Sequence, residues 1–253
     1  MTQPDPFPTG EEGSRAPIFV VGCQRSGTTA LRLMLDSHRH IACGPETRFL
    51  TGLEPITGES WERISRFGFP REYWLAKTAD YFGSFHAEYA AARGKRRWAD
   101  KSPLYALILP FVWELFPDAQ VVHLIRDPRD VTASHRVAFG YKSALNAPRK
   151  WQRYIRQVRA AAAAAPSGRY YEMRYEDLAA DRESALRALL GFLGEPWDPA
   201  MLDYENRPHD VNERYWARTR ERRAGSTRRR RLDPVLAGAV RVLSQPLRRE
   251  LGY

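Results

Sequence analysis

Residues 18–38 read IFVVGCQRSGTTALRLMLDSH, and this stretch decides the fold. The apolar run at 18–22 predicts a buried strand, and residues 28–38 place their apolar side chains on one stripe of a helix. Between them, Gly22 and Gly27 allow a tight turn in which the backbone approaches a ligand closely. A strand, a glycine turn and a helix N-terminus together form an anion site, because unpaired N–H groups and the helix dipole both favour negative charge.

The turn has the glycine spacing of a phosphate-binding loop, but Thr28 and Thr29 stand where a nucleotide triphosphatase carries Lys and then Ser or Thr. The candidate phosphate-binding residues are Gln24, Arg25, Ser26, Gly27, Thr28 and Thr29. Arg25 offers a charged fork and the two threonines offer hydroxyl donors. The alternative is a plain glycine turn with a capping Ser or Thr. Because the best second strand ends in Arg126 and not in an acidic metal ligand, we expect phosphate binding without Mg²⁺.

A second candidate anion site follows the strand predicted at 119–125, AQVVHLI, which runs into RDPRDVTAS at 126–134. Arg126 would lie at the carboxyl edge of the sheet, where open α/β sheets bind ligands, and Ser134 about two turns into the next helix. A phosphate between them would receive a guanidinium and a hydroxyl. The alternative is an Asp-capped helix start whose arginines are solvated or paired with nearby aspartates.

The remaining pattern alternates short strands with longer helices, which predicts an α/β fold with a P-loop-type parallel sheet flanked by helices on both faces. Further strands are expected at 96–99 and 169–175, and helical segments at 60–93, 103–116 with a kink at Pro110, 128–139, 148–165, 182–193 and 233–250. We expect a disordered tail over residues 1–16 and a single domain over 17–253.

Composition narrows the partners of this 253-residue chain. Its net charge is +10, with 40 basic residues, so its surface should attract anions. The N-terminus lacks a signal-peptide pattern, no apolar run approaches the ~20 residues of a membrane span, and the two cysteines have no metal-ligand spacing. We therefore expect a cytoplasmic protein without nucleic-acid or membrane partners and without a metal, and leave a homodimer open.

Several stretches resemble one family. GCQRSGTTALRLMLDSH is similar to the 5′-phosphosulfate loop of the sulfotransferases, and LIRDPRDVTAS resembles their 3′-phosphate motif. The similarity extends to WADKSPLY, RYEDL and LGFLGEPWDP, and CGPETRFL is similar to tyrosylprotein sulfotransferases and their bacterial relatives. The resemblance implies a sulfotransferase fold and 3′-phosphoadenosine 5′-phosphosulfate (PAPS) as co-substrate. It also implies transfer of a sulfuryl group to a hydroxyl, with adenosine 3′,5′-bisphosphate as product.

The resemblance also implies roles for single residues. It places the general base at Glu46, a basic group near the leaving phosphate at Arg25, and a lysine near the transferred sulfate at Lys101. The loop that covers the nucleotide would fall on RAGSTRRRRLDP, with Ser226 and one of the arginines from Arg228 to Arg231 as its candidates. The alternative is a solvated basic run, or a contact with nucleic acid or a membrane.

Alternatives stay open at this point. His38 and His40 lie near Glu46 in the sequence and compete with it as bases. A degenerate P-loop kinase or nucleotide triphosphatase, or a basic protein that binds nucleic acid or another polyanion, would also be positively charged. The acceptor is either a small hydroxylated metabolite or a tyrosyl-like phenol. The sequence departs from the tyrosylprotein enzymes at Phe49–Gly52, where those enzymes continue to another arginine, and the aromatic residues in 53–95 are expected to build the acceptor pocket.

Overall fold

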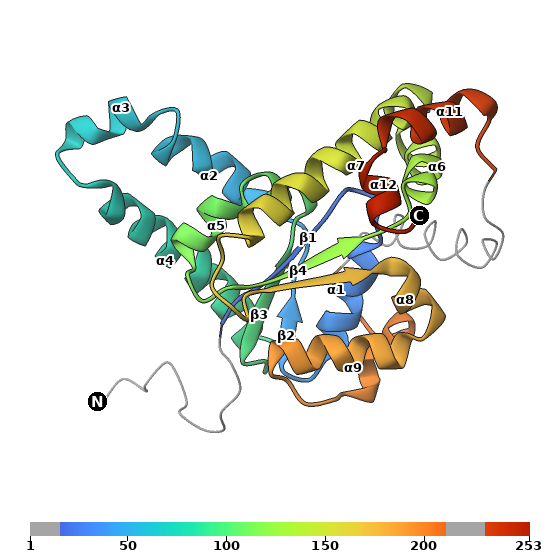
Figure 1. Ribbon diagram of the computed structural model, residues 1–253. Helices are drawn as coiled ribbons and strands as arrows, with labels where there is room; N and C mark the ends of the chain where they lie inside the picture. Colours follow the sequence, from blue (N-terminus) through green and yellow to red (C-terminus); the bar gives the residue numbers. More distant parts are fainter. Residues whose placement is uncertain (1–15, 211–230) are drawn as a thin grey trace.

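The computed structural model describes residues 16–210 and 231–253 (Figure 1). The predicted tail at 1–16 therefore lies outside the described residues except for Ala16, whose carbonyl accepts a hydrogen bond from Arg97 Nε at 2.7 Å. The elements are β1 (Ile18–Val21), α1 (Thr28–Ser37), β2 (Ile41–Cys43), α2 (Phe49–Thr57), α3 (Trp61–Ile64), η1 (Ser65–Phe67), α4 (Arg71–Ala91), β3 (Arg97–Lys101), η2 (Pro103–Leu107), α5 (Leu109–Leu115), β4 (Gln120–Ile125), α6 (Pro128–Phe139), α7 (Tyr141–Ala162), β5 (Tyr170–Arg174), α8 (Tyr175–Ala180), α9 (Arg182–Leu193), η3 (Pro199–Met201), η4 (Tyr204–Asn206), α11 (Pro234–Leu243) and α12 (Leu247–Glu250).

The five strands form one sheet in the order β2-β3-β1-β4-β5, and every neighbouring pair is parallel. The carboxyl ends of the strands therefore meet at one edge of the sheet. The segments that leave β1, β2, β3 and β4 carry the predicted phosphate loop, Glu46, Ser102 and Arg126 respectively. This topology brings together stretches up to about a hundred residues apart in the sequence.

Helices cover both faces of the sheet, which confirms the predicted α/β class (Figure 1). In β1 the side chains alternate: Phe19 and Val21 enter the core under α4, α5 and α7, whereas Ile18 and Val20 enter the core under α1 and α9. Both cores consist of fully buried apolar side chains, so the central strands read as continuous apolar runs.

The structure corrects several predicted elements. An edge strand, β2, was missed because its three residues are too short to show a period. β3 extends to Lys101, and the predicted helix 103–116 is instead a 3₁₀ turn followed by α5, with Pro110 in the first turn of α5. The predicted helix at 233–250 is divided into α11 and α12.

The helix predicted at 148–165 begins earlier, at Tyr141, and contains Pro148. Proline removes one intrahelical hydrogen bond, but Pro148 is buried with Ala144, Ala147 and Trp151 on the face that packs toward the sheet. Burial of that face therefore outweighs the lost bond.

Helices α2, α3 and α4 extend away from the sheet as an arm (Figure 1). Large aromatic side chains remain exposed along this arm, including Phe67, Phe69, Tyr81 and Phe85. Within 16–210 and 231–253, no helix is both long and apolar enough to cross a bilayer.

Candidate active site

The turn between β1 and α1 packs closely on its neighbours and depends on two glycines. Gly22 has φ 149°, and a Cβ there would lie 2.5 Å from the carbonyl oxygen of Leu124. Gly27 has φ 102°, and a Cβ would lie 2.4 Å from the ring of Tyr175. The first turn of α1 has no side-chain cap and no acidic residue. The N–H groups of Ala30 and Leu31 donate to the Gly27 carbonyl, so Thr28 and Thr29 supply the first-turn N–H groups that suit an anion.

Arg25 joins the two predicted anion elements. It has φ 74°, a left-handed conformation that is uncommon for a residue with a side chain. Its Nε donates to Ser134 Oγ at 2.9 Å. The phosphate loop and helix α6 are therefore in direct contact, although 109 residues separate the two partners.

Arg126 lies beside this contact at the end of β4. Its guanidinium stacks on the ring of Tyr175 at 4.1 Å and pairs with Asp130 at 3.3 Å. Arg126 Nε and Ser26 Oγ are both buried without a hydrogen-bond partner among the described residues. Buried polar atoms are rarely left unpaired, so these two point to a ligand that accepts hydrogen bonds.

A cavity of about 510 Å³ adjoins Arg126 through Asp130. Its charged lining consists of Arg129, Asp130, Arg231, Arg241 and Arg248. This concentration of guanidinium groups extends the positive charge of the site away from the phosphate loop.

Glu46 follows β2 at the same edge of the sheet and is half-buried. Its Oε2 accepts from Lys101 Nζ at 2.6 Å and its Oε1 from Arg48 Nε at 2.8 Å. Burial raises the pKa of Glu46, but Lys101 and Arg48 together outweigh burial and hold that pKa below its ordinary value. The carboxylate is therefore ionised at neutral pH.

The segment that carries Glu46 is held by buried groups that the sequence analysis did not select. Thr47 Oγ1 donates to Asp100 Oδ2 at 3.1 Å, and the backbone N–H of Leu50 donates to Tyr105 Oη at 3.1 Å. Asp100 and Tyr105 are fully buried on β3 and η2. The ADKSP stretch, whose Lys101 was predicted, thus also supplies the support beneath Glu46.

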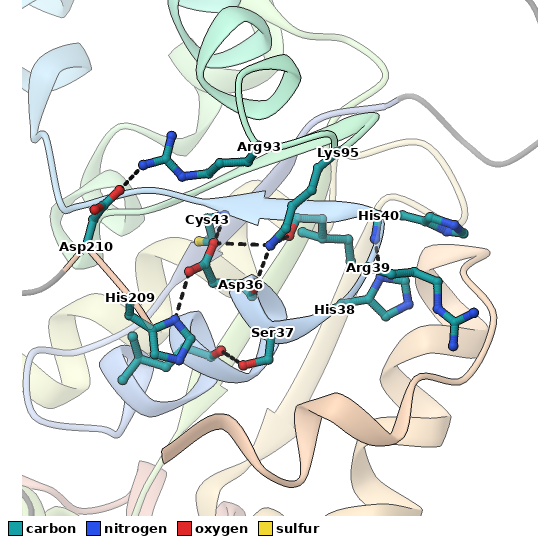
Figure 2. Close-up of polar contacts among 12 residues, drawn as sticks. Asp36, Ser37, His38, Arg39, His40, Cys43, Arg93, Lys95, His209 and Asp210 are labelled. Atoms are coloured by element: carbon teal, nitrogen blue, oxygen red, sulfur yellow. Dashed lines mark hydrogen bonds and ion pairs between the residues drawn. The ribbon is translucent and has the colours of Figure 1, made fainter. Parts of the chain in front are cut away.

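His38 and His40 lie away from this edge. They precede β2, whereas Glu46 follows it, so they lie near the opposite edge of the parallel sheet, next to Arg39 (Figure 2). His38 Nε2 is 2.9 Å from the carbonyl of Pro196, and His40 Nδ1 is 3.2 Å from Glu195. The structure therefore does not bring either histidine to Glu46.

His38, His40 and Glu195 also form a cluster with metal-ligand spacing. Arg96 and Arg97 both pair with Glu195, at 3.0 and 3.2 Å. The guanidinium groups of Arg96 and Arg97 thus supply the positive charge that a metal ion would bring to Glu195.

The remaining predicted residues stand as follows. Gln24, Thr28 and Thr29 lie in the phosphate loop and the first turn of α1. Ser226 and Arg228 lie outside the described residues. Arg48 was missed as a partner of Glu46, although it stands two residues away in PETRF.

The parallel sheet and the glycine loop after its central strand define an α/β protein with a P-loop-type sheet. Comparison with known proteins makes this assignment specific. The pattern of the sulfotransferase family matches residues 17–199, and the chain belongs to that family.

Relatives and solved structures agree with the family. A protein-tyrosine sulfotransferase of Drosophila melanogaster is 30% identical over 211 residues, covering 77% of this chain and 42% of that protein. A putative protein-tyrosine sulfotransferase of Caenorhabditis briggsae is 31% identical, over 74% and 68%. The sulfotransferase domain of the Synechococcus PCC 7002 olefin synthase shares the fold, with TM-score 0.64, 24% identity and 97% coverage of both chains. The chain spans about half the length of most curated relatives that it matches.

Proposed function

We propose that the chain is an O-sulfotransferase that moves the sulfuryl group of PAPS to a hydroxyl acceptor. The observation that carries this proposal is the contact of Arg25 with Ser134, beside the unpaired Nε of Arg126. Two phosphate-type elements thus meet at one edge of the sheet, which suits a nucleotide with phosphates at both ends of its ribose.

The residues present fit such a nucleotide. Residues 24–29 would hold its 5′ side through loop N–H groups, hydroxyls and Arg25, and Arg126 and Ser134 would hold its 3′-phosphate. The buried, unpaired Ser26 Oγ supports this assignment. When bound, PAPS supplies an activated sulfuryl group and a bisphosphate leaving group.

Glu46 is proposed as the general base. The acceptor oxygen bonds to sulfur while the bond from sulfur to the 5′-phosphate oxygen breaks, and the acceptor proton passes to a Glu46 carboxylate oxygen. Each oxygen already accepts a hydrogen bond from a cation, so the acceptor proton passes either to a remaining lone pair or to an oxygen from which the acceptor has displaced a cation. Lys101, which stays beside Glu46, is proposed to stabilise charge on the transferred group or the leaving phosphate. Basic side chains then serve as the electrostatic clamp, and we propose no metal.

The acceptor is proposed to be a small hydroxylated metabolite or a tyrosyl-like phenol. Relatives named protein-tyrosine sulfotransferases support the phenol. The exposed aromatic side chains of the α2–α4 arm, which begins three residues after Glu46, suit either acceptor. The cytoplasmic location and the single domain stay predictions.

Calorimetric titration with three ligands tests the proposal. We expect adenosine 3′,5′-bisphosphate to bind in EDTA, while Mg²⁺-ATP and an oligonucleotide bind much more weakly. Replacing Arg126 by Ala should weaken bisphosphate binding by at least about tenfold, because charge-assisted hydrogen bonds contribute about 1.5–3 kcal/mol.

Arg169→Ala is the matched control, because Arg169 is a half-buried arginine that pairs with Asp118 and precedes β5, away from the carboxyl edge of the sheet. Its affinity should equal that of the wild type. Tight Mg²⁺-ATP binding would favour the kinase alternative, and tight oligonucleotide binding that salt abolishes would favour the polyanion alternative.

A further inference from the structure

His135 lies directly behind the phosphate loop and has no role in the proposed chemistry. It follows Ser134 on α6 and is fully buried. Its Nε2 is 3.3 Å from the carbonyl oxygen of Gln24, and its Nδ1 is 3.1 Å from Ser143 Oγ on α7. The imidazole therefore connects the loop to two helices.

The partners of His135 determine where its proton lies. A carbonyl oxygen only accepts hydrogen bonds, so Nε2 must carry a hydrogen and donate it to Gln24. Burial lowers the pKa of His135 to about 4; the Gln24 carbonyl acts in the opposite direction, and the nearby Lys150 and Arg25 lower it further. The ring is thus neutral at pH 7, and its bare Nδ1 accepts from the Ser143 hydroxyl. The Gln24 carbonyl thus selects the tautomer, and the Ser143 hydroxyl, which can donate or accept, stabilises it at Nδ1.

The bond from His135 fixes the peptide unit that Gln24 shares with Arg25. In a trans peptide the N–H points opposite to the carbonyl, so the Arg25 N–H is held facing away from His135. The same arginine has the left-handed φ of 74°, and its side chain donates to Ser134, the neighbour of His135. Helix α6 therefore fixes both the backbone and the side chain of Arg25.

We infer that His135 is a positioning residue that holds the Gln24–Arg25 peptide, and through it Arg25, in the orientation that receives the nucleotide. The expected effect of His135 on nucleotide binding rests on the proposed function. Its expected effect on the conformation of the loop does not. Without the Nε2 donor, the Gln24 carbonyl loses this partner, and the peptide is free to rotate and relieve the strain at Arg25.

Two substitutions distinguish the hydrogen bond that His135 donates from the space that its ring fills. His135→Phe fills the site without a donor, and His135→Gln places an amide N–H near the position of Nε2. We expect His135→Phe to raise the Kd for adenosine 3′,5′-bisphosphate by about tenfold, and His135→Gln to restore most of the affinity. His38→Phe is the matched control, because His38 is equally buried but lies beyond the other end of α1. It should leave the affinity unchanged.

Amide hydrogen exchange of residues 24–27 in the ligand-free protein supplies a readout independent of the nucleotide. We expect faster exchange in His135→Phe than in the wild type or His135→Gln. Ser143→Ala is a milder change and should give intermediate exchange. If His135→Phe does not fold, the exchange of Ser143→Ala tests whether His135 holds the loop. Equal affinity and exchange in the Phe and Gln variants would overturn the inference. If the wild type did not bind the bisphosphate, the proposed function would fail, and hydrogen exchange alone would decide on His135.

Discussion

Glu46 carries a cation on each carboxylate oxygen, and the two cations differ in exposure. The Lys101 side chain is only 5% exposed, whereas that of Arg48 is 57% exposed. Arg48 therefore is the partner that an acceptor can displace at lower cost, and Lys101 remains to hold the carboxylate in place. This difference suggests that Arg48 controls both access to Glu46 and its basicity.

Replacing Arg48 by Ala should move the acid limb of the kcat/KM profile to higher pH. Arg48 favours the charged form of Glu46, so its loss raises the pKa of Glu46, and activity is then lost at a less acidic pH. We expect a shift of less than about one pH unit, because the pair is solvent-screened. Steady-state rates from pH 4 to 8 measure it.

Glu46→Gln provides the reference for that profile. Its turnover should fall by about 10²–10⁴-fold with bisphosphate affinity retained, as expected for loss of a general base. An unchanged acid limb in Arg48→Ala, or normal turnover in Glu46→Gln, would remove Glu46 from the role of base.

The loop between β1 and α1 depends on close packing against α8 as much as on its own conformation. Gly27→Ala forces a side chain into the left-handed region and against the Tyr175 ring, on which Arg126 stacks. We expect a loss of about 1–3 kcal/mol in the free energy of unfolding. Bisphosphate affinity should also fall, because Arg126 loses its platform. Urea denaturation and calorimetry measure the two effects.

Gly52→Ala is the matched control for that substitution. Gly52 lies in α2, and a Cβ built there would meet no atom within 4 Å other than its chain neighbours and the nearby backbone of its own helix. Alanine should stabilise the helix by about 0.4–1 kcal/mol without changing bisphosphate affinity. Equal effects of the two substitutions would show that the contact with Tyr175 is unimportant.

The elements that the sequence predicted well are those whose signal is local. β1 and β4 are apolar runs, the first followed by Gly22 and the second by Arg-Asp-Pro, and both lie where the sequence predicted them. The turn predicted between β1 and the next helix also lies there. β2 has only three residues and is a strand because it pairs with β3. Its own sequence is too short to predict a strand, because the pairing depends on residues elsewhere in the chain. The helix predicted to begin at residue 148 likewise begins earlier, at Tyr141, and only burial against the sheet shows that it continues through Pro148.

The residues of the candidate site also divide into those with a local sequence signal and those without one. Arg25 and Arg126 could be selected because they stand in short motifs after predicted strands, and Glu46 because its PETRF stretch resembles that of the tyrosylprotein sulfotransferases. His135 and Asp100 could not, because their partners are distant in the chain: His135 contacts Gln24 across 111 residues, and Asp100 contacts Thr47 across 53. A sequence pattern indicates which residues meet the ligand. The residues that hold them are defined by tertiary packing.

One buried polar cluster connects four segments of the whole molecule (Figure 2). Asp36, at the end of α1, accepts from the backbone N–H of Cys43 at 3.0 Å and pairs with His209 at 2.8 Å and with Lys95 at 3.6 Å. Beside it, Asp210 binds Arg93. The cluster thus attaches the last described residues before position 211 to the sheet and to the end of α4.

Asp36→Asn should destabilise the whole fold in a pH-dependent way. Burial raises the pKa of Asp36, but the bonds from His209 and Cys43 and the charge of Lys95 outweigh burial, so the native pKa is lowered. A lowered native pKa gives stability that is present above the ordinary Asp value, near pH 4, and is lost as pH falls through the native value. We expect a deficit of about 3 kcal/mol at pH 7, because the ammonium of Lys95 loses its carboxylate partner and His209 loses the carboxylate oxygen beside its Nδ1, and a much smaller deficit near pH 3.

Urea denaturation of the wild type and Asp36→Asn at both pH values checks this expectation. Asp118→Asn is the control, since Asp118 is 76% exposed and its pair with Arg169 should contribute less than about 1 kcal/mol. A deficit that is the same at pH 7 and pH 3 would mean that Asp36 acts through shape and hydrogen bonding alone. A deficit that shrinks toward pH 3 would show that the carboxylate's charge holds α1, β2 and the segment around His209 together.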